Sequence, residues 1–197
     1  MKIAICLFLF SCLAVAPLFA QLPTDNPVDA LRTPGWNKGI YGGYSTSVDS
    51  TPSGQSVIGA FRIGRVLTHE LGSGPLRGSF EMAVDLIPVD AFWSHGGVYG
   101  GGINPVVFKW NFTKGCKYSP YLSLDGGVLF TTHNLPPGDT SNINFITGPE
   151  LGLQMFHKGQ NSINLTLKAF HLSNASIGNH NPGINASMQF LIGYTWH

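Results

Sequence analysis

Charged residues are scarce in this chain of 197 amino acids. Lys, Arg, Asp and Glu together make up 11% of it, whereas an ordinary soluble domain has about 25%. The formal net charge is +1, and the chain has no basic run of the kind that indicates a nucleic-acid partner. This deficit indicates a surface that meets lipid rather than water.

Cysteine is also rare, with three in the whole chain. Cys6 and Cys12 lie in a segment that opens with one lysine and stays apolar to Leu18-Phe19-Ala20, which is typical of a secretory signal peptide. A single membrane anchor is the alternative for this segment. Cleavage after Ala20 leaves Cys116 alone, so we expect neither a disulfide framework nor a thiolate metal cluster.

Long apolar runs are missing after the signal, which excludes a helical membrane protein. Instead, apolar and polar residues alternate with the period of a β-strand. Eight such segments lie near 38–48, 57–68, 76–88, 98–112, 117–131, 142–157, 161–173 and 185–196. We therefore divide the chain into a signal peptide (1–20), an N-terminal lead-in (21–37), expected to be extended, and a barrel (38–197).

The connections between these segments alternate in length. Those after the first, third, fifth and seventh segments are long and polar, whereas those after the fourth and sixth are short. Outer-membrane barrels show this pattern, with long outer loops and short periplasmic turns. The fold class expected is all-β: an eight-stranded antiparallel up-and-down transmembrane β-barrel, located in the bacterial outer membrane.

The two faces of the seventh segment differ. Its odd positions read Ile163, Leu165, Leu167, Ala169, and its even positions are more polar. A soluble barrel of the lipocalin type would turn such an apolar face inward. The low charge favours the opposite arrangement, with the apolar row toward lipid.

His171 and Ser173 continue that apolar row at the end of the segment. Side chains two residues apart in a strand share a face, with Cα atoms roughly 6.5 Å apart. An imidazole at that spacing is able to serve as general base for a serine hydroxyl. On an outward row at the outer end of strand seven, the pair would face the acyl esters of lipopolysaccharide.

The residues His171-Leu172-Ser173-Asn174-Ala175, with Asn181-Pro182-Gly183 after them, resemble the signature of the lipid A 3-O-deacylase (PagL) family and of related acyloxyacyl hydrolase-like proteins. The resemblance implies an outer-membrane ester hydrolase that removes the 3-O acyl chain of lipid A, without metal or cofactor. It assigns Ser173 as nucleophile and His171 as base. It also implies that Asn174 and Asn181 help to shape the oxyanion hole.

Two positions depart from the family pattern. Asn185 stands where a glutamate orients the histidine, and Ser176 replaces a glycine. An asparagine is able to hold an imidazole in the correct tautomer, so Asn185 is the third candidate catalytic residue, although strict alternation would place it on the face opposite Phe190. The alternative is an outer-membrane barrel that is catalytically weak or inactive and has a structural or adhesion role.

The partners expected from the sequence are lipid A in the outer leaflet and, during insertion, the barrel-assembly machinery, since the last strand ends with the aromatic residues Tyr194 and Trp196. No nucleic-acid partner is expected. The sequence leaves open whether the barrel is a monomer or a homodimer.

Overall fold

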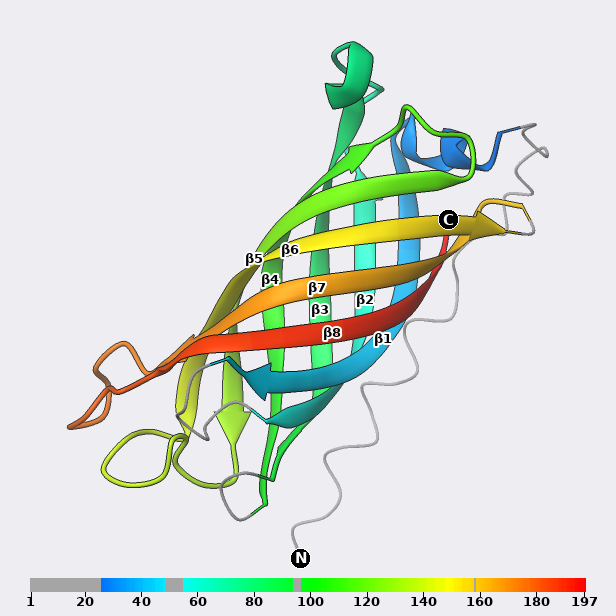
Figure 1. Cartoon of the computed structure of the whole chain (residues 1–197). Helices are drawn as coiled ribbons and strands as arrows, with labels where there is room; N and C mark the ends of the chain where they lie inside the picture. The colour runs from blue at the N-terminus through cyan, green and yellow to red at the C-terminus, as the bar shows by residue number, and fades with distance from the viewer. Residues whose placement is uncertain (1–25, 49–54, 94–96, 158) are drawn as a thin grey trace, which may run out of the picture.

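The chain forms a closed antiparallel barrel of eight strands, in which each strand pairs with its neighbours in sequence and β1 pairs with β8 (Figure 1). This computed structural model describes residues 26–48, 55–93, 97–157 and 159–197, without the side chains of 185 and 186. The strands are β1 (Gly35–Ser47), β2 (Ser56–Val66), β3 (Gly78–Phe92), β4 (Val98–Phe112), β5 (Tyr118–Thr131), β6 (Ile143–His157), β7 (Asn161–Ser173) and β8 (Ile184–Trp196). The predicted fold class is confirmed.

The two ends of the barrel differ. The connections after β1, β3, β5 and β7 gather at one end, called here the loop end, which lies at the lower left of Figure 1. The connections after β2, β4 and β6 lie at the other, the turn end, together with the short 3-10 helix η1 (Pro27–Leu31). The expected signal peptide, 1–20, lies outside the described residues. Among those residues, no helix has the length and apolar character needed to cross a bilayer.

The sequence suggested an extended lead-in before β1, but part of this segment forms the 3-10 helix η1. The side chain of Asn26 accepts a hydrogen bond from the Val28 N–H and caps η1, which has a proline at its start. Val28 and Leu31 pack in a buried cluster with Val66 and Phe156. The lead-in therefore closes the turn end of the barrel.

The outer surface of the barrel is apolar. Large apolar side chains are exposed on every strand, for example Phe61 on β2, Leu122 on β5 and Phe190 on β8. On β7 the odd positions predicted to face lipid are the exposed ones, and Ser162 and Lys168 at even positions are buried. The lipocalin-type arrangement is therefore wrong, because its apolar face would point inward.

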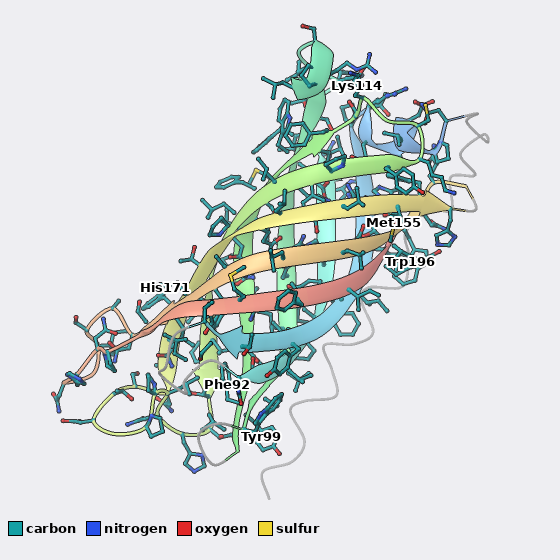
Figure 2. All side chains as sticks on the ribbon, viewed as in Figure 1. Phe92, Tyr99, Lys114, Met155, His171 and Trp196 are labelled. Carbon is teal, nitrogen blue, oxygen red and sulfur yellow. The ribbon has the colours of Figure 1, made fainter. Side chains whose placement is uncertain are left out.

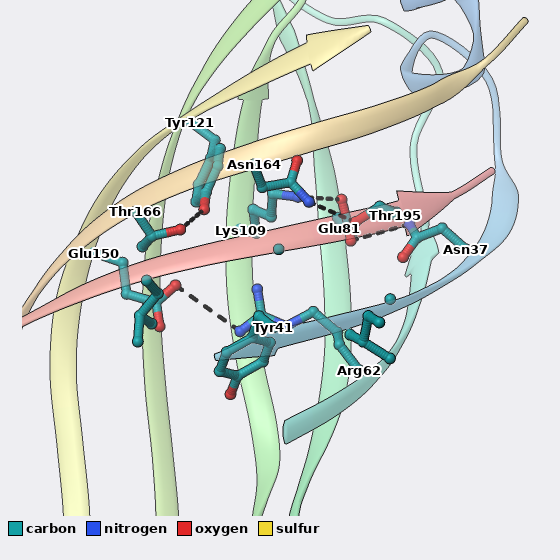
Figure 3. Close-up of a pocket in the computed structure, with 14 residues that line it drawn as sticks. Asn37, Tyr41, Arg62, Glu81, Lys109, Tyr121, Glu150, Asn164, Thr166 and Thr195 are labelled. Carbon is teal, nitrogen blue, oxygen red and sulfur yellow. Dashed lines mark hydrogen bonds and ion pairs between the residues drawn. The ribbon is translucent and has the colours of Figure 1, made fainter. Parts of the chain in front are cut away.

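The interior is filled by paired polar side chains (Figure 3). The Arg62 guanidinium donates from Nε to Asp85 Oδ1 at 2.6 Å and from Nη2 to Oδ2 at 2.8 Å. Lys168 forms an ion pair with Asp125 and lies 3.8 Å from a carboxylate oxygen of Glu150. Pairing of this kind is what makes buried charge tolerable, and it makes Asp125 and Glu150 part of a network in the lumen.

An apolar cluster closes the lumen near the loop end. Its members include Ile58, Phe92, Leu129, Leu135, Leu172 and Ile184. Phe92 belongs to β3, which runs four residues beyond the predicted end at 88. The strand continues past Pro88 because the register with β4 shifts between Ile87 and Asp90, and a bulge is where a strand accommodates a residue without an N–H.

Candidate functional site

His171 lies on the outer surface of the barrel, at the loop end of β7 (Figure 2). Ser173 is the last residue of the same strand and shares its outward face. Both side chains are half-buried, and they follow Ile163, Leu165 and Leu167, which are exposed in the same outward row. No hydrogen bond joins the two side chains in the described structure. The two residues predicted to carry the chemistry therefore share one face, as the alternation required.

The neighbouring strand β6 supplies one wall of this site. Thr147 is the register partner of His171, and Phe145 is the partner of Ser173. The Thr147 hydroxyl donates to the Asp125 backbone carbonyl oxygen at 2.5 Å. That bond fixes the threonine beside the imidazole.

The other neighbour, β8, contains a bulge at the level of His171. Leu172 pairs with Ile184 and Phe170 pairs with Ser187, so two residues of β8, Asn185 and Ala186, stand opposite the single residue His171. Ile184 and Ser187 are both buried although they are three residues apart. Strict alternation, which placed residue 185 on the inner face, therefore does not hold here. The backbone of Asn185 lies beside His171, while its side chain is outside the described part.

Asn174 organises the loop that follows Ser173. Its backbone N–H donates to Asn181 Oδ1 at 3.1 Å, and its side-chain Nδ2 donates to the His180 carbonyl oxygen at 2.9 Å. Its Oδ1 accepts the Ser176 N–H at 2.9 Å, and the side chain is buried. The backbone N–H and one N–H of the Asn174 amide are thus engaged within the loop. Asn181, by contrast, is exposed.

The loop turns through two residues with left-handed backbone angles. Ala175 has φ of 49° and Ser176 has φ of 63°. A non-glycine residue is uncommon in that region, because its Cβ crowds the backbone. The structure therefore gives a physical reason for the glycine that the family pattern has where this chain has Ser176.

A second loop, between β5 and β6, packs against this one. Asn179 Nδ2 donates to both carboxylate oxygens of Asp139, at 3.1 and 3.0 Å, and the His180 N–H donates to the Asp139 carbonyl oxygen at 2.9 Å. Gly178 lies so close to Thr140 that a Cβ there would stand 2.5 Å from its carbonyl oxygen. Sequence reasoning missed this contact. The sequence indicated only that residues 132–141 form a long polar loop.

An apolar groove crosses the outer surface below the site. The register places Leu151 on β6, Leu167 on β7 and Phe190 on β8 side by side, with Leu153, Leu165 and Ile192 in the next row. These six side chains, with Pro120, Gly152, Thr166 and Leu191, line the groove. Leu167 is four residues from His171, roughly 13 Å along the strand. Between them the outward row holds only Ala169, a small residue.

The arrangement therefore places a hydroxyl, an imidazole and a loop with side-chain amides at one end of an apolar groove. A serine with an adjacent base is the arrangement of a covalent ester hydrolase. The described residues contain no group of His, Cys, Asp and Glu side chains placed to hold a metal ion.

Comparison with known proteins identifies the family. A family model described as lipid A 3-O-deacylase (PagL) matches residues 40–195. Two solved structures similar to this one are the outer-membrane enzyme PagL (16% identity, TM-score 0.48, covering 81% of this chain and 99% of that one) and Neisserial surface protein A (12% identity, TM-score 0.46, covering 81% and 95%). No curated protein matched the sequence.

Proposed function

Because the chain belongs to the lipid A 3-O-deacylase (PagL) family, we propose that it is an outer-membrane serine esterase that removes the 3-O-linked acyl chain from lipid A of lipopolysaccharide. One observation carries the proposal: His171 and Ser173 share the outward row of β7, above an apolar groove. A hydrolytic pair on the outer wall of a barrel is accessible to a substrate that lies in the membrane.

In the proposed reaction Ser173 Oγ attacks the ester carbonyl carbon while His171 takes the hydroxyl proton. The tetrahedral intermediate collapses, the sugar oxygen leaves with the proton from His171, and the acyl group stays on Ser173. Water then attacks the acyl-enzyme with His171 again as base, releasing the fatty acid. No metal or cofactor enters any step.

The oxyanion of that intermediate needs a hydrogen-bond donor near Ser173. Asn181 is the residue we assign, because its Oδ1 is hydrogen-bonded to the N–H of Asn174, the residue after the nucleophile. That bond leaves the Nδ2 of Asn181 as a donor close to Ser173. Asn174 then contributes by holding Asn181 and the loop rather than by donating itself.

Asn185 is our proposed orienting residue for the imidazole. The bulge in β8 brings its backbone opposite His171, and bulges next to active sites commonly re-aim a side chain. A side-chain carbonyl oxygen there would accept the imidazole N–H and hold its tautomer. It would not carry the charge that stabilises an imidazolium, so turnover would be slower than with a carboxylate.

The apolar groove gives the scissile acyl chain a place to lie. Ala169 and its register partner Met188 separate the site from Leu167 and Phe190, and the small alanine leaves the path along the row open. An acyl chain packed there would be held with its ester carbonyl at Ser173. This packing would supply the orientation on which the attack depends.

The location and partners follow from the same proposal. Residues 1–20 would direct export, the apolar barrel wall would sit in the outer membrane, and the final strand would be read by the barrel-assembly machinery. Lipid A would reach the site from the outer leaflet. The proposed chemistry does not require a second copy of the chain.

A second candidate function is a barrel that has lost catalysis and keeps a structural or adhesion role. The observation that favours it is Asn185 in place of a carboxylate. The two candidates differ in one direct readout, because only the esterase changes the lipid A of the cell.

Mass spectrometry of lipid A from cells with and without the protein tests the proposal. We expect loss of the mass of one ester-linked hydroxyacyl chain when wild type is expressed, and intact lipid A with Ser173→Ala at equal outer-membrane abundance. Deacylation that persists in Ser173→Ala would contradict the assignment. Unchanged lipid A with wild type would favour the structural role.

A further inference from the structure

The cationic residues of this chain are distributed unevenly along the barrel axis. Of the eleven Lys and Arg residues, Lys2 lies in the expected signal peptide, and three point into the lumen. The lumen residues are Arg62, Lys109 and Lys168, each beside a carboxylate. Six of the remaining seven belong to the turn end or its connections: Arg32, Lys38, Arg65, Arg77, Lys114 and Lys117. The seventh, Lys158, lies in the sequence between β6 and β7 and outside the described residues.

At the turn end these cations are built into the surface beside aromatic rings. The Arg65 guanidinium lies 5.3 Å from the ring centroid of Trp36, and the Lys117 ammonium lies 5.9 Å from that of Tyr118. Arg and Lys flanking an aromatic girdle suit contact with anionic headgroups at a bilayer surface. This chain therefore places permanent cations at one membrane surface.

The loop end is built differently. The segments 39–61, 86–108, 126–149 and 169–197, which include all four loops and the site, contain no Lys or Arg in the sequence. A carboxylate contacts the site loop: Asp139 is exposed and accepts hydrogen bonds from Asn179. Around Ser173 the polar groups are the imidazoles of His171 and His180 together with amides and hydroxyls, which include those of Asn181 and Thr147.

Phosphate groups on a ligand are normally held by Arg or Lys, through charge-assisted and often bidentate hydrogen bonds. A phosphate that approached this loop end would instead meet the exposed carboxylate of Asp139, and the two like charges would repel each other, an effect that added salt screens. Amides and hydroxyls suit the neutral hydroxyl and amide groups of an acylated amino sugar.

Resting on the proposed function, we infer that the site recognises the substrate as an uncharged acylated diglucosamine and prefers lipid A without phosphates to its phosphorylated form. The neutral polar groups of the 174–183 loop would contact the sugar, and Asp139 would select against an anionic headgroup. The reaction itself is unchanged.

The test uses purified full-length barrel in nonionic micelles with two lipid A preparations of identical acyl pattern, one bisphosphorylated and one dephosphorylated. Released hydroxy fatty acid gives kcat/KM at pH 8, at low and high salt, with and without EDTA. We expect kcat/KM to be at least threefold higher on the dephosphorylated lipid. Added salt should raise it only for the phosphorylated lipid, because it screens the repulsion.

Asp139→Asn keeps an acceptor for Asn179 and removes the charge, so it should reduce the ratio between the two substrates. Asp29→Asn, which removes a carboxylate at the turn end, is the matched control and should leave the ratio unchanged. Equal or faster hydrolysis of the phosphorylated lipid would overturn the inference. A loss of activity on either lipid when EDTA removes divalent cations would also overturn it. Failure to hydrolyse either lipid would instead contradict the proposed function and the inference together.

Discussion

The backbone N–H of Asn174 donates to the side-chain oxygen of Asn181, which ties the residue after the proposed nucleophile to the far side of its loop. Asn181→Asp keeps the acceptor and removes the Nδ2 donor. Loss of one oxyanion donor lowers kcat by about 10²–10³-fold, and we expect that loss here with little change in KM, measured by steady-state release of fatty acid.

The control for this prediction is Asn142→Asp, which adds the same charge at an exposed position of the β5–β6 loop and should leave kcat near that of wild type. An Asn181→Asp variant with wild-type kcat would show that Asn181 is not the donor.

Asn185 is the proposed orienting residue for His171, and the predicted rate depends on its charge. A glutamate at this position would pair with the imidazolium formed during attack, and hydrogen bonds between charged groups are roughly twice as strong as neutral ones. We expect Asn185→Glu to raise kcat about tenfold, which corresponds to about 1.4 kcal/mol, and Asn185→Ala to lower it. Rates that are equal in all three proteins would contradict an orienting role.

Ala169 is the small residue between the site and the groove. Ala169→Trp should obstruct the path of the acyl chain and raise KM at least tenfold, while the barrel still folds because the side chain points to lipid. Val84→Trp is the matched control, since Val84 is exposed on β3, across the barrel from β7. Equal KM values for the two variants would show that the chain lies elsewhere.

The lumen network makes a separate prediction about stability. Arg62→Met leaves Asp85 buried without its main partner, and breaking a buried pair costs about 3–5 kcal/mol. Arg65→Met, three positions along β2, removes an exposed cation over Trp36 and should cost at most about 1 kcal/mol. Urea unfolding in lipid vesicles measures both, and equal costs would contradict a structural role for the lumen pair.

The period-two pattern predicted most of the fold because each strand has one apolar and one polar face. β7 was predicted at 161–173 and has those bounds. The pattern failed where the chain leaves strict alternation. β3 continues through a bulge past Pro88, four residues beyond the predicted end. η1 was missed because the prolines of the lead-in, of which only Pro27 lies in η1, indicated an extended chain.

The site shows the same division. The outward placement of His171 and Ser173 followed from parity with Leu165 and Leu167. The position of Asn185 did not, because a bulge changes parity and depends on pairing with β7. The contact between Asp139 and the site loop joins residues forty positions apart, and nothing local in either segment specifies it.

Hydrolysis by purified variants tests the central claim most directly. Wild type, Ser173→Ala and Ser176→Ala, folded to the same extent in the same micelles, are compared on lipid A by the release of 3-hydroxy fatty acid. Because Ser176 lies three residues on in the same loop, it controls for loss of a nearby hydroxyl. The account predicts release by wild type and Ser176→Ala and none by Ser173→Ala. Equal release by Ser173→Ala and wild type would contradict it.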